Sequence, residues 1–142
     1  MGWRRKCKAM AIVEFSLVVP MFLLLCLAGV DFARVFQSAM TITGATRAGL
    51  EYASGSSGAS NDTTGIANTV KAAAGNLSGI SVASSQFCTC SLGSSQVSCT
   101  NSCSGKTAYI QVTTTIPFTT ASGWPWVPNT LSVTSSGSMR VQ

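Results

Sequence analysis

Few residues in this chain are of the types that do chemistry, and they form two groups. The chain has no histidine and four acidic residues among 142. One acidic residue, Glu14, lies inside the apolar run AMAIVEFSLVVPMFLLLCLAGV at residues 9–30. A carboxylate in hydrocarbon costs at least about 2.5 kcal/mol and is usually functional. The second group is four cysteines at residues 88–103, spaced C-x-C and C-x3-C.

The sequence predicts no catalytic centre. Catalysis by proton transfer needs convergent titratable groups, and the acids besides Glu14 are only Asp31, Glu51 and Asp62. The chain shows no glycine-rich phosphate loop and no nucleophile elbow among its many serines and threonines. We therefore predict that the protein is not an enzyme and uses no cofactor and no small-molecule substrate.

The element around Glu14 is a candidate membrane helix. Residues 10–30 form 21 positions, or roughly 31 Å of helix at about 1.5 Å per residue, which is enough to span a bilayer. Four of the nine basic residues lie in the first eight positions, a pattern that keeps the N-terminus in the cytoplasm and sends the rest outward. Asp31 and Arg34 end the run on one helix face, and we interpret them as a pair at the membrane boundary. Because the remaining charges nearly balance, we predict no nucleic-acid partner.

The cysteine group then lies on the oxidising side of the membrane. Zinc sites usually have C-x2-4-C twice or use histidine, which this chain lacks, so two disulfides are favoured over a metal site. Cysteines in C-x-C rarely pair with each other, so Cys88 and Cys90 are each expected to reach Cys99 or Cys103 across a hairpin. The sequence does not choose the connectivity.

The elements that must position these groups make an α+β protein. The helical period continues past the membrane, which predicts one long helix from about residue 11 to residue 53, with a kink at Pro20. After a Ser/Gly-rich loop, Asn61 or Asp62 can cap a short second helix. Its expected buried stripe is Ile66, Val70, Ala73 and Leu77.

Three antiparallel strands are expected at residues 80–84, 108–118 and 130–141. In the second strand, one face is apolar: Ile110, Val112, Ile116 and Phe118. In the third, Leu131, Val133, Met139 and Val141 share a face. Residues 119–129, with two tryptophans, form a long turn over the sheet edge. The expected divisions are a basic cytoplasmic leader (1–9), a transmembrane helix (10–30), its extracytoplasmic extension (31–54) and a disulfide-braced α+β domain (55–142).

The N-terminal residues also fit a known processing signal. Arg4, Arg5, Lys6 and Lys8 precede Ala9, then MAIV, then Glu14 and Phe15, the layout of a class III signal cut by a prepilin peptidase. The stretch AIVEFSLVVPMFLLLCLAGVDFARVF resembles the TadE-like pseudopilins of the tight-adherence (Flp) pilus. Its DFAR ending, from Asp31 to Arg34, and the following TRAGLEYA at residues 46–53 are similar to that family, and the resemblance is diffuse beyond residue 54.

The resemblance implies a function and a cleavage site. The peptidase would cut between Ala9 and Met10, where the family usually has Gly in place of Ala9, and would leave Glu14 as the fifth residue of the mature chain. Glu14 and Phe15 would form the prepilin motif that packs against other subunits. Because major Flp pilins are much shorter, the chain resembles a minor pilin or assembly factor of this type IVb pilus, with a role in cell adhesion. Its implied partners are the peptidase, other pilins and pilus-assembly proteins.

Two alternatives remain at this stage. The chain could be an unprocessed single-pass envelope protein whose outer domain binds a partner, or a secreted domain released by an ordinary signal peptidase near Gly29. For the pseudopilin and for the unprocessed envelope protein alike, the expected location is the bacterial inner membrane, with the N-terminus in the cytoplasm and the C-terminal domain outside it.

Overall fold

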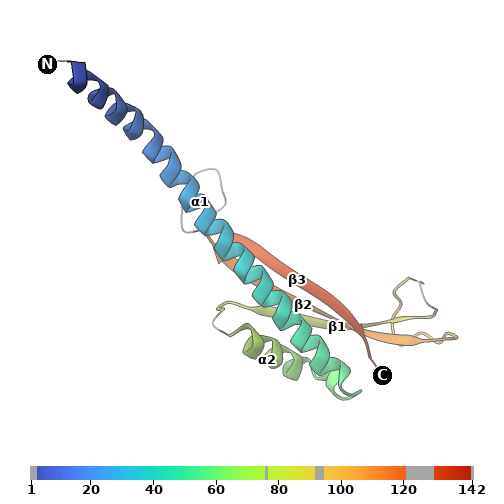
Figure 1. Cartoon of the computed structure of the whole chain (residues 1–142). Coiled ribbons are helices and arrows are strands. Elements are labelled where there is room, and N and C mark those ends of the chain that lie inside the picture. The colour runs from blue at the N-terminus through green and yellow to red at the C-terminus, as the bar shows by residue number, and fades with distance from the viewer. Residues whose placement is uncertain (1–2, 76, 92–94, 121–129, 142) are drawn as a thin grey trace.

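The chain folds as a long helix carrying a small α+β head (Figure 1). A computed structural model describes residues 3–75, 77–91, 95–120 and 130–141, and the side chains from Met10 onward. Its elements are α1 (Trp3–Ser54), a 3-10 turn η1 (Ala59–Asn61), α2 (Thr63–Ala74), β1 (Ser81–Thr89), β2 (Thr107–Thr119) and β3 (Thr130–Arg140). The predicted α+β class, with one long helix, one short helix and three antiparallel strands, is confirmed.

Helix α1 has two different halves. Its second half buries residues spaced three and four apart, the period that keeps one helix face against a core. These are Ile42, Ala45, Thr46, Gly49, Leu50 and Ala53. Its first half projects beyond the head and contacts no other described element (Figure 1). Pro20 lies inside this projecting half, and the kink expected there stays a prediction.

Helix α2 begins and ends at the predicted kinds of residue. The Asp62 carboxylate caps it by accepting a hydrogen bond from the Gly65 amide at 2.8 Å, and Gly75 ends it with φ of 61°. Ile66 and Val70 are buried as expected. The rest of the predicted stripe is wrong: Ala73 is exposed and Ala74 is buried instead, because a spacing of four continues the face of residues 66 and 70. Leu77 lies beyond the end of the helix.

The sheet has the order β1-β2-β3 with both pairs antiparallel. The predicted apolar face of β2 is buried under α1, and Thr114 is buried with it. Ile110 and Val112 of this face also share an apolar cluster with residues of α2. Val133 of β3 pairs with Ile116 and Leu131 pairs with Phe118, so the third strand presents its apolar residues to the same side. Strand β1 runs further than predicted, to Thr89, because it continues into the cysteine hairpin. The turn at residues 121–129 lies outside the described residues.

Contacts along α1 show that it runs in the same direction as β3. The Arg34 guanidinium lies 5.4 Å from the centre of the Phe118 ring, and Phe118 pairs with Leu131 at the start of β3. The hydroxyls of Thr46 and Thr114 are hydrogen-bonded at 2.9 Å. Further along, a Cβ on Gly137 would come 2.8 Å from Leu50 Cδ1, so glycine allows the helix to approach the strand closely.

Candidate assembly surface on the N-terminal helix

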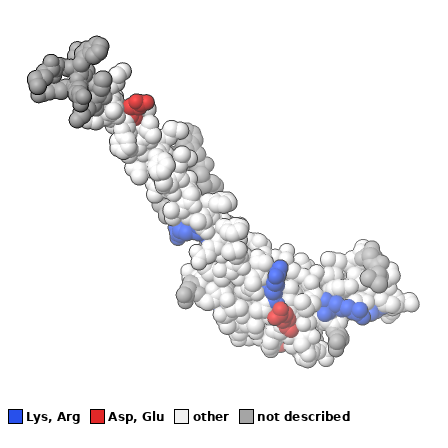
Figure 2. All heavy atoms as spheres, in the orientation of Figure 1, with Lys and Arg blue, Asp and Glu red and all other residues white. Residues whose placement is uncertain are grey.

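The projecting half of α1 is an apolar surface that no described part of the chain covers. From Met10 to Val30 nearly every large side chain is more than half exposed, and the mean hydropathy of the best 18-residue window is 2.4. By length and composition, this helix could cross a membrane. In Figure 2, the part of the rod that is not drawn grey is almost wholly uncharged.

Glu14 is the one charged residue between Met10 and Val30. It is exposed, and it shares a shallow surface with the apolar side chains of Met10, Val13, Leu17 and Val18. Residues four positions apart on a helix lie one above the other, so the carboxylate stands one turn from Met10. Ala9 and Met10 both lie within the helix. A carboxylate surrounded by exposed apolar groups is suited to pair with a cation brought by another molecule.

Asp31 and Arg34 meet where the head begins. The Arg34 Nη1 atom lies 3.6 Å from Asp31 Oδ1, and the Asp31 side chain is only 14% exposed. Because Arg34 also lies over the Phe118 ring, it joins the ion pair to the end of β2. The sequence indicated the spacing of the pair, but no sequence signal pointed to Phe118.

Exposed apolar residues continue past this pair. Phe36 is 56% exposed and Met40 is 58% exposed, although both lie in the half of α1 that packs on the head. They occupy the flank of the helix that also carries Arg47 and Glu51, on the side of β3. The exposed apolar surface of α1 thus extends from Met10 to Met40, beyond the stretch that a bilayer would cover.

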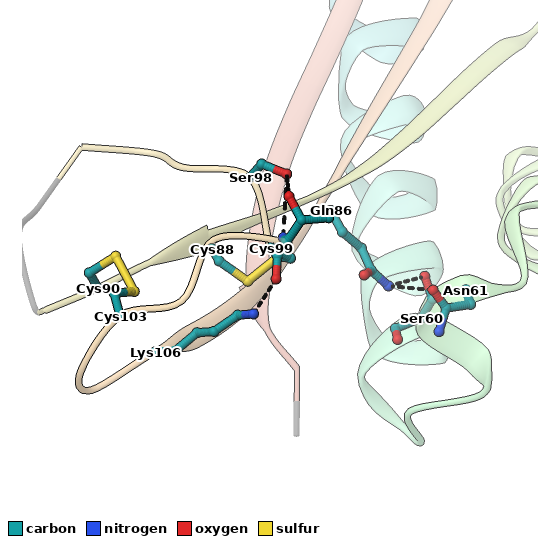
Figure 3. The surroundings of a disulfide bond; sticks show 10 residues. Ser60, Asn61, Gln86, Cys88, Cys90, Ser98, Cys99, Cys103 and Lys106 are labelled. Atoms are coloured by element: carbon teal, nitrogen blue, oxygen red, sulfur yellow. Dashed lines mark hydrogen bonds between the residues drawn. A yellow bond between two sulfur atoms is a disulfide. The ribbon is translucent and has the colours of Figure 1, made fainter.

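The four cysteines form two disulfides at the end of the head farthest from the projecting helix (Figure 3). Cys88 pairs with Cys99 and Cys90 pairs with Cys103, with Cα atoms 5.0 and 5.6 Å apart. Each cysteine of the C-x-C pair reaches across the hairpin, and the connectivity that the sequence left open is now given. The Lys106 ammonium donates a hydrogen bond to the Cys99 carbonyl. Among the described residues, no group of three potential ligands could hold a metal ion.

A polar contact at the far end of α1 ties it to α2. The Tyr52 hydroxyl donates to Asp62 Oδ2 at 2.9 Å, on the same carboxylate that caps α2. The hydrogen bond from the Gly65 amide, and then the one from Tyr52, lowers the pKa of Asp62 from its ordinary 3.8. The same contact raises the pKa of Tyr52 from its ordinary 10.0. The sequence predicted the cap but not its partner Tyr52.

Comparison with known proteins assigns the N-terminal segment. A family model described as TadE-like protein matches residues 9–50. This segment is TadE-like. The match confirms the resemblance predicted from the sequence and covers α1 from residue 9 to residue 50. No match was found among curated proteins or among solved structures.

The TadE-like segment contains Glu14, the Asp31–Arg34 pair and the exposed Phe36 and Met40, whereas the cysteine hairpin lies outside it. The family match suggests involvement in assembly of the tight-adherence (Flp) pilus, and the family is not one of enzymes. One apolar N-terminal helix that could span a membrane fits a membrane-anchored pilus protein.

Proposed function

We propose that the chain is a minor pilin, or pseudopilin, that takes part in assembly of a tight-adherence pilus. A prepilin peptidase cuts it between Ala9 and Met10, and its long helix joins the helices of other pilins. The protein sits in the bacterial inner membrane with residues 1–9 in the cytoplasm, residues 10–30 in the bilayer, and residues 31–54 and the disulfide-braced head at 55–142 outside.

The length of the exposed apolar surface supports this proposal. Thirty-one residues from Met10 to Met40 span about 46 Å at 1.5 Å per residue, whereas a hydrocarbon core is about 30 Å thick. A helix that served only as an anchor would need exposed apolar groups only within the bilayer. Phe36 and Met40 lie beside the head, where water would otherwise meet them, and an apolar helix of another subunit is a suitable cover.

Glu14 has a defined role in this proposal. Cleavage gives Met10 a free amine, and Glu14 lies one turn further along the helix. When two subunits pack side by side, the carboxylate of one can neutralise the amine of the other, because a paired charge in lipid is tolerated and a lone one is not. The pair would then set the axial register of the subunits. Glu14→Leu and Glu14→Ala should both stop assembly, and normal pili with normal recruitment of the variants would rule out this role.

The mass of the mature N-terminus tests the processing step. The proposal expects a chain that begins at Met10, and Ala9→Gly should increase the cleaved fraction because the family usually has Gly there. A chain that begins at Met1 or Gly2 would support the alternative, an unprocessed anchor with an outer binding domain. The unusual Ala9 at the cleavage site favours this alternative. A chain that begins near Gly29 would show an ordinary signal peptide.

A further inference from the structure

Strand β3 leaves a row of backbone groups without partners among the described residues. Cys88 exchanges two backbone hydrogen bonds with Val97, at 2.9 and 2.8 Å, so its amide and carbonyl point away from β2. The residue of β2 opposite Cys88 is Ala108, and its amide and carbonyl therefore point toward β3. There the Ala108 carbonyl accepts a hydrogen bond from the Val141 amide at 3.0 Å. Backbone direction alternates along antiparallel strands. The outward amides and carbonyls of β3 thus belong to its even-numbered residues: Ser132, Thr134, Ser136 and Ser138.

The two edges of the sheet differ in how they are protected. The β1 edge is closed at Cys88 by Val97, and α2 packs over β1. Along β3, no described segment pairs with the outward backbone, and the strand contains no proline and no charge before Arg140 at its end. Natural proteins usually block such an edge with charges, prolines, bulges or a covering segment. A long uncharged edge is therefore suited to accept another strand.

The side of β3 next to α1 offers a groove to such a strand. The groove has a volume of about 410 Å³ and lies between the helix, with Arg47 and Glu51, and residues 135–139 of the strand. Figure 2 shows adjoining basic and acidic groups over this part of α1. Toward the membrane, the exposed side chains of Phe36 and Met40 continue the same flank of the helix. A strand in this groove would meet apolar groups at its membrane-proximal end and charged groups at the end farther from the membrane.

The direction of the added strand follows from the membrane anchor. Because α1 and β3 run the same way, β3 of an anchored chain runs away from the membrane. A neighbour's edge strand that also runs away from the membrane must then pair with β3 in parallel. Antiparallel pairing of β3 with its own copy would point the second α1 away from the membrane.

The β1 edge of a second copy also fits poorly. Three strands occupy about 14 Å across a sheet at about 4.8 Å each. Two packed helices such as α1 and α2 need about 16 to 20 Å, at 8 to 10 Å each. A head repeated edge to edge through β3 and β1 would therefore crowd α2 of one copy against α1 of the next.

We propose that the β3 edge docks a strand of a different pilin-type subunit, anchored in the same membrane, which extends the sheet in parallel. The inference rests on the proposed function, since it takes α1 as an anchored assembly helix. The strand that fits is uncharged in its membrane-proximal half, carries apolar side chains toward Phe36 and Met40, and carries polar ones toward Arg47 and Glu51.

Photo-crosslinking in cells that make the full chain tests this edge. The probe p-benzoylphenylalanine is placed at Ser132, Ser136 or Ser138, and at the equally exposed Ser85 of β1 as the matched control. We expect the three β3 positions, but not Ser85, to crosslink to another membrane-anchored pilin-type subunit. Residues captured from Ser138 should lie later in that partner's sequence than those captured from Ser132, which is the mark of parallel pairing.

A proline variant tests whether capture depends on the outward backbone of β3. Ser136→Pro removes an outward amide and no bond within the sheet, and edge strands tolerate proline at such positions. It should lower the yield from Ser132 at least about tenfold, the effect of roughly 1.4 kcal/mol in binding, while Ser84→Pro leaves it unchanged. Intact disulfides and normal membrane levels show that each variant has folded.

Several results would overturn the inference: no crosslink from β3, equal crosslinking from Ser85, the reverse order along the partner, or capture of a second copy of this chain. These results are separate from failure of the proposed function. A chain that starts at Met10 and supports pili but gives no crosslink from β3 would contradict only the docking of a strand at β3. An uncleaved chain that still crosslinks through β3 would contradict only the proposed cleavage.

Discussion

The two halves of α1 have the same secondary structure and opposite surroundings. From Met10 to Val30 apolar residues cover every side of the helix, and from Val35 to Ala53 a buried stripe packs on the head while the other faces are exposed. A helix that is apolar all round needs an environment to bury it, whereas an amphipathic one finds its cover within the chain. The buried stripe of the second half therefore supports the head, whereas the apolar surface of the first half has no cover among the described residues.

Truncating one isoleucine in each half should give the largest contrast. Ile42→Ala removes a fully buried side chain and should lower the free energy of unfolding of the head by about 2 to 5 kcal/mol. Ile12→Ala changes a side chain that is 68% exposed and should change it by less than about 0.5 kcal/mol. Denaturant unfolding of the full chain in detergent, followed by near-UV circular dichroism, measures both. Similar losses in the two variants would show that the projecting half supports the head.

Removing cysteines should give the second largest contrast. Replacing both Cys88 and Cys99 with Ser opens a loop with a sequence separation of 11 and should lower head stability by about 2 to 4 kcal/mol. Cys26→Ser, in the projecting half, changes a free and exposed thiol and should have no measurable effect. Thermal unfolding of the two variants under oxidising conditions provides the comparison. A head as stable without the Cys88–Cys99 bond would contradict the bracing role.

Changing the pH should give the smallest effect, confined to the packed half. The pKa of Asp62 is lowered on folding, so its contribution is complete above the unfolded pKa of 3.8 and is lost as the pH falls through the folded value. The pKa of Tyr52 is raised, so its contribution is complete below 10.0 and is lost as the pH rises through the folded value. Asp62→Asn should flatten the acid limb of a stability profile, and Tyr52→Phe the alkaline limb. Profiles identical to that of the native chain would show that the contact between Tyr52 and Asp62 does not contribute to stability.

The sequence predicted what depends on local pattern and missed what depends on contacts between distant segments. Apolar periodicity was enough for α1, α2 and the apolar face of β2. The stripe of α2 was wrong at Ala73 because the residue facing the core there depends on how α2 lies against α1. Disulfide connectivity was open because C-x-C offers two cysteines with nearly equal loops, and only the Cys88–Val97 pairing sets which one lies opposite Cys99.

In the candidate site, too, the sequence predicted the features that depend on neighbouring residues and missed those that depend on distant contacts. Glu14, the Asp31–Arg34 pair and the family were recognisable from residues close together in the chain. The exposure of Phe36 and Met40 was not, because which faces of a helix remain uncovered depends on where the head packs. The position of β3 at the edge of the described sheet likewise depends on the strand order.

Pilus yield from a Phe36→Ser/Met40→Ser variant tests the central claim most directly. Both residues lie outside the predicted membrane span and on the uncovered flank of α1, so anchoring and the fold of the head should be unaffected. A matched control, Thr43→Ser/Arg47→Lys, alters the same flank without removing apolar surface. We expect pili per cell to fall sharply in the first variant and to stay normal in the control, with equal membrane levels. Normal piliation in the first variant would contradict the claim that this exposed surface packs against another subunit.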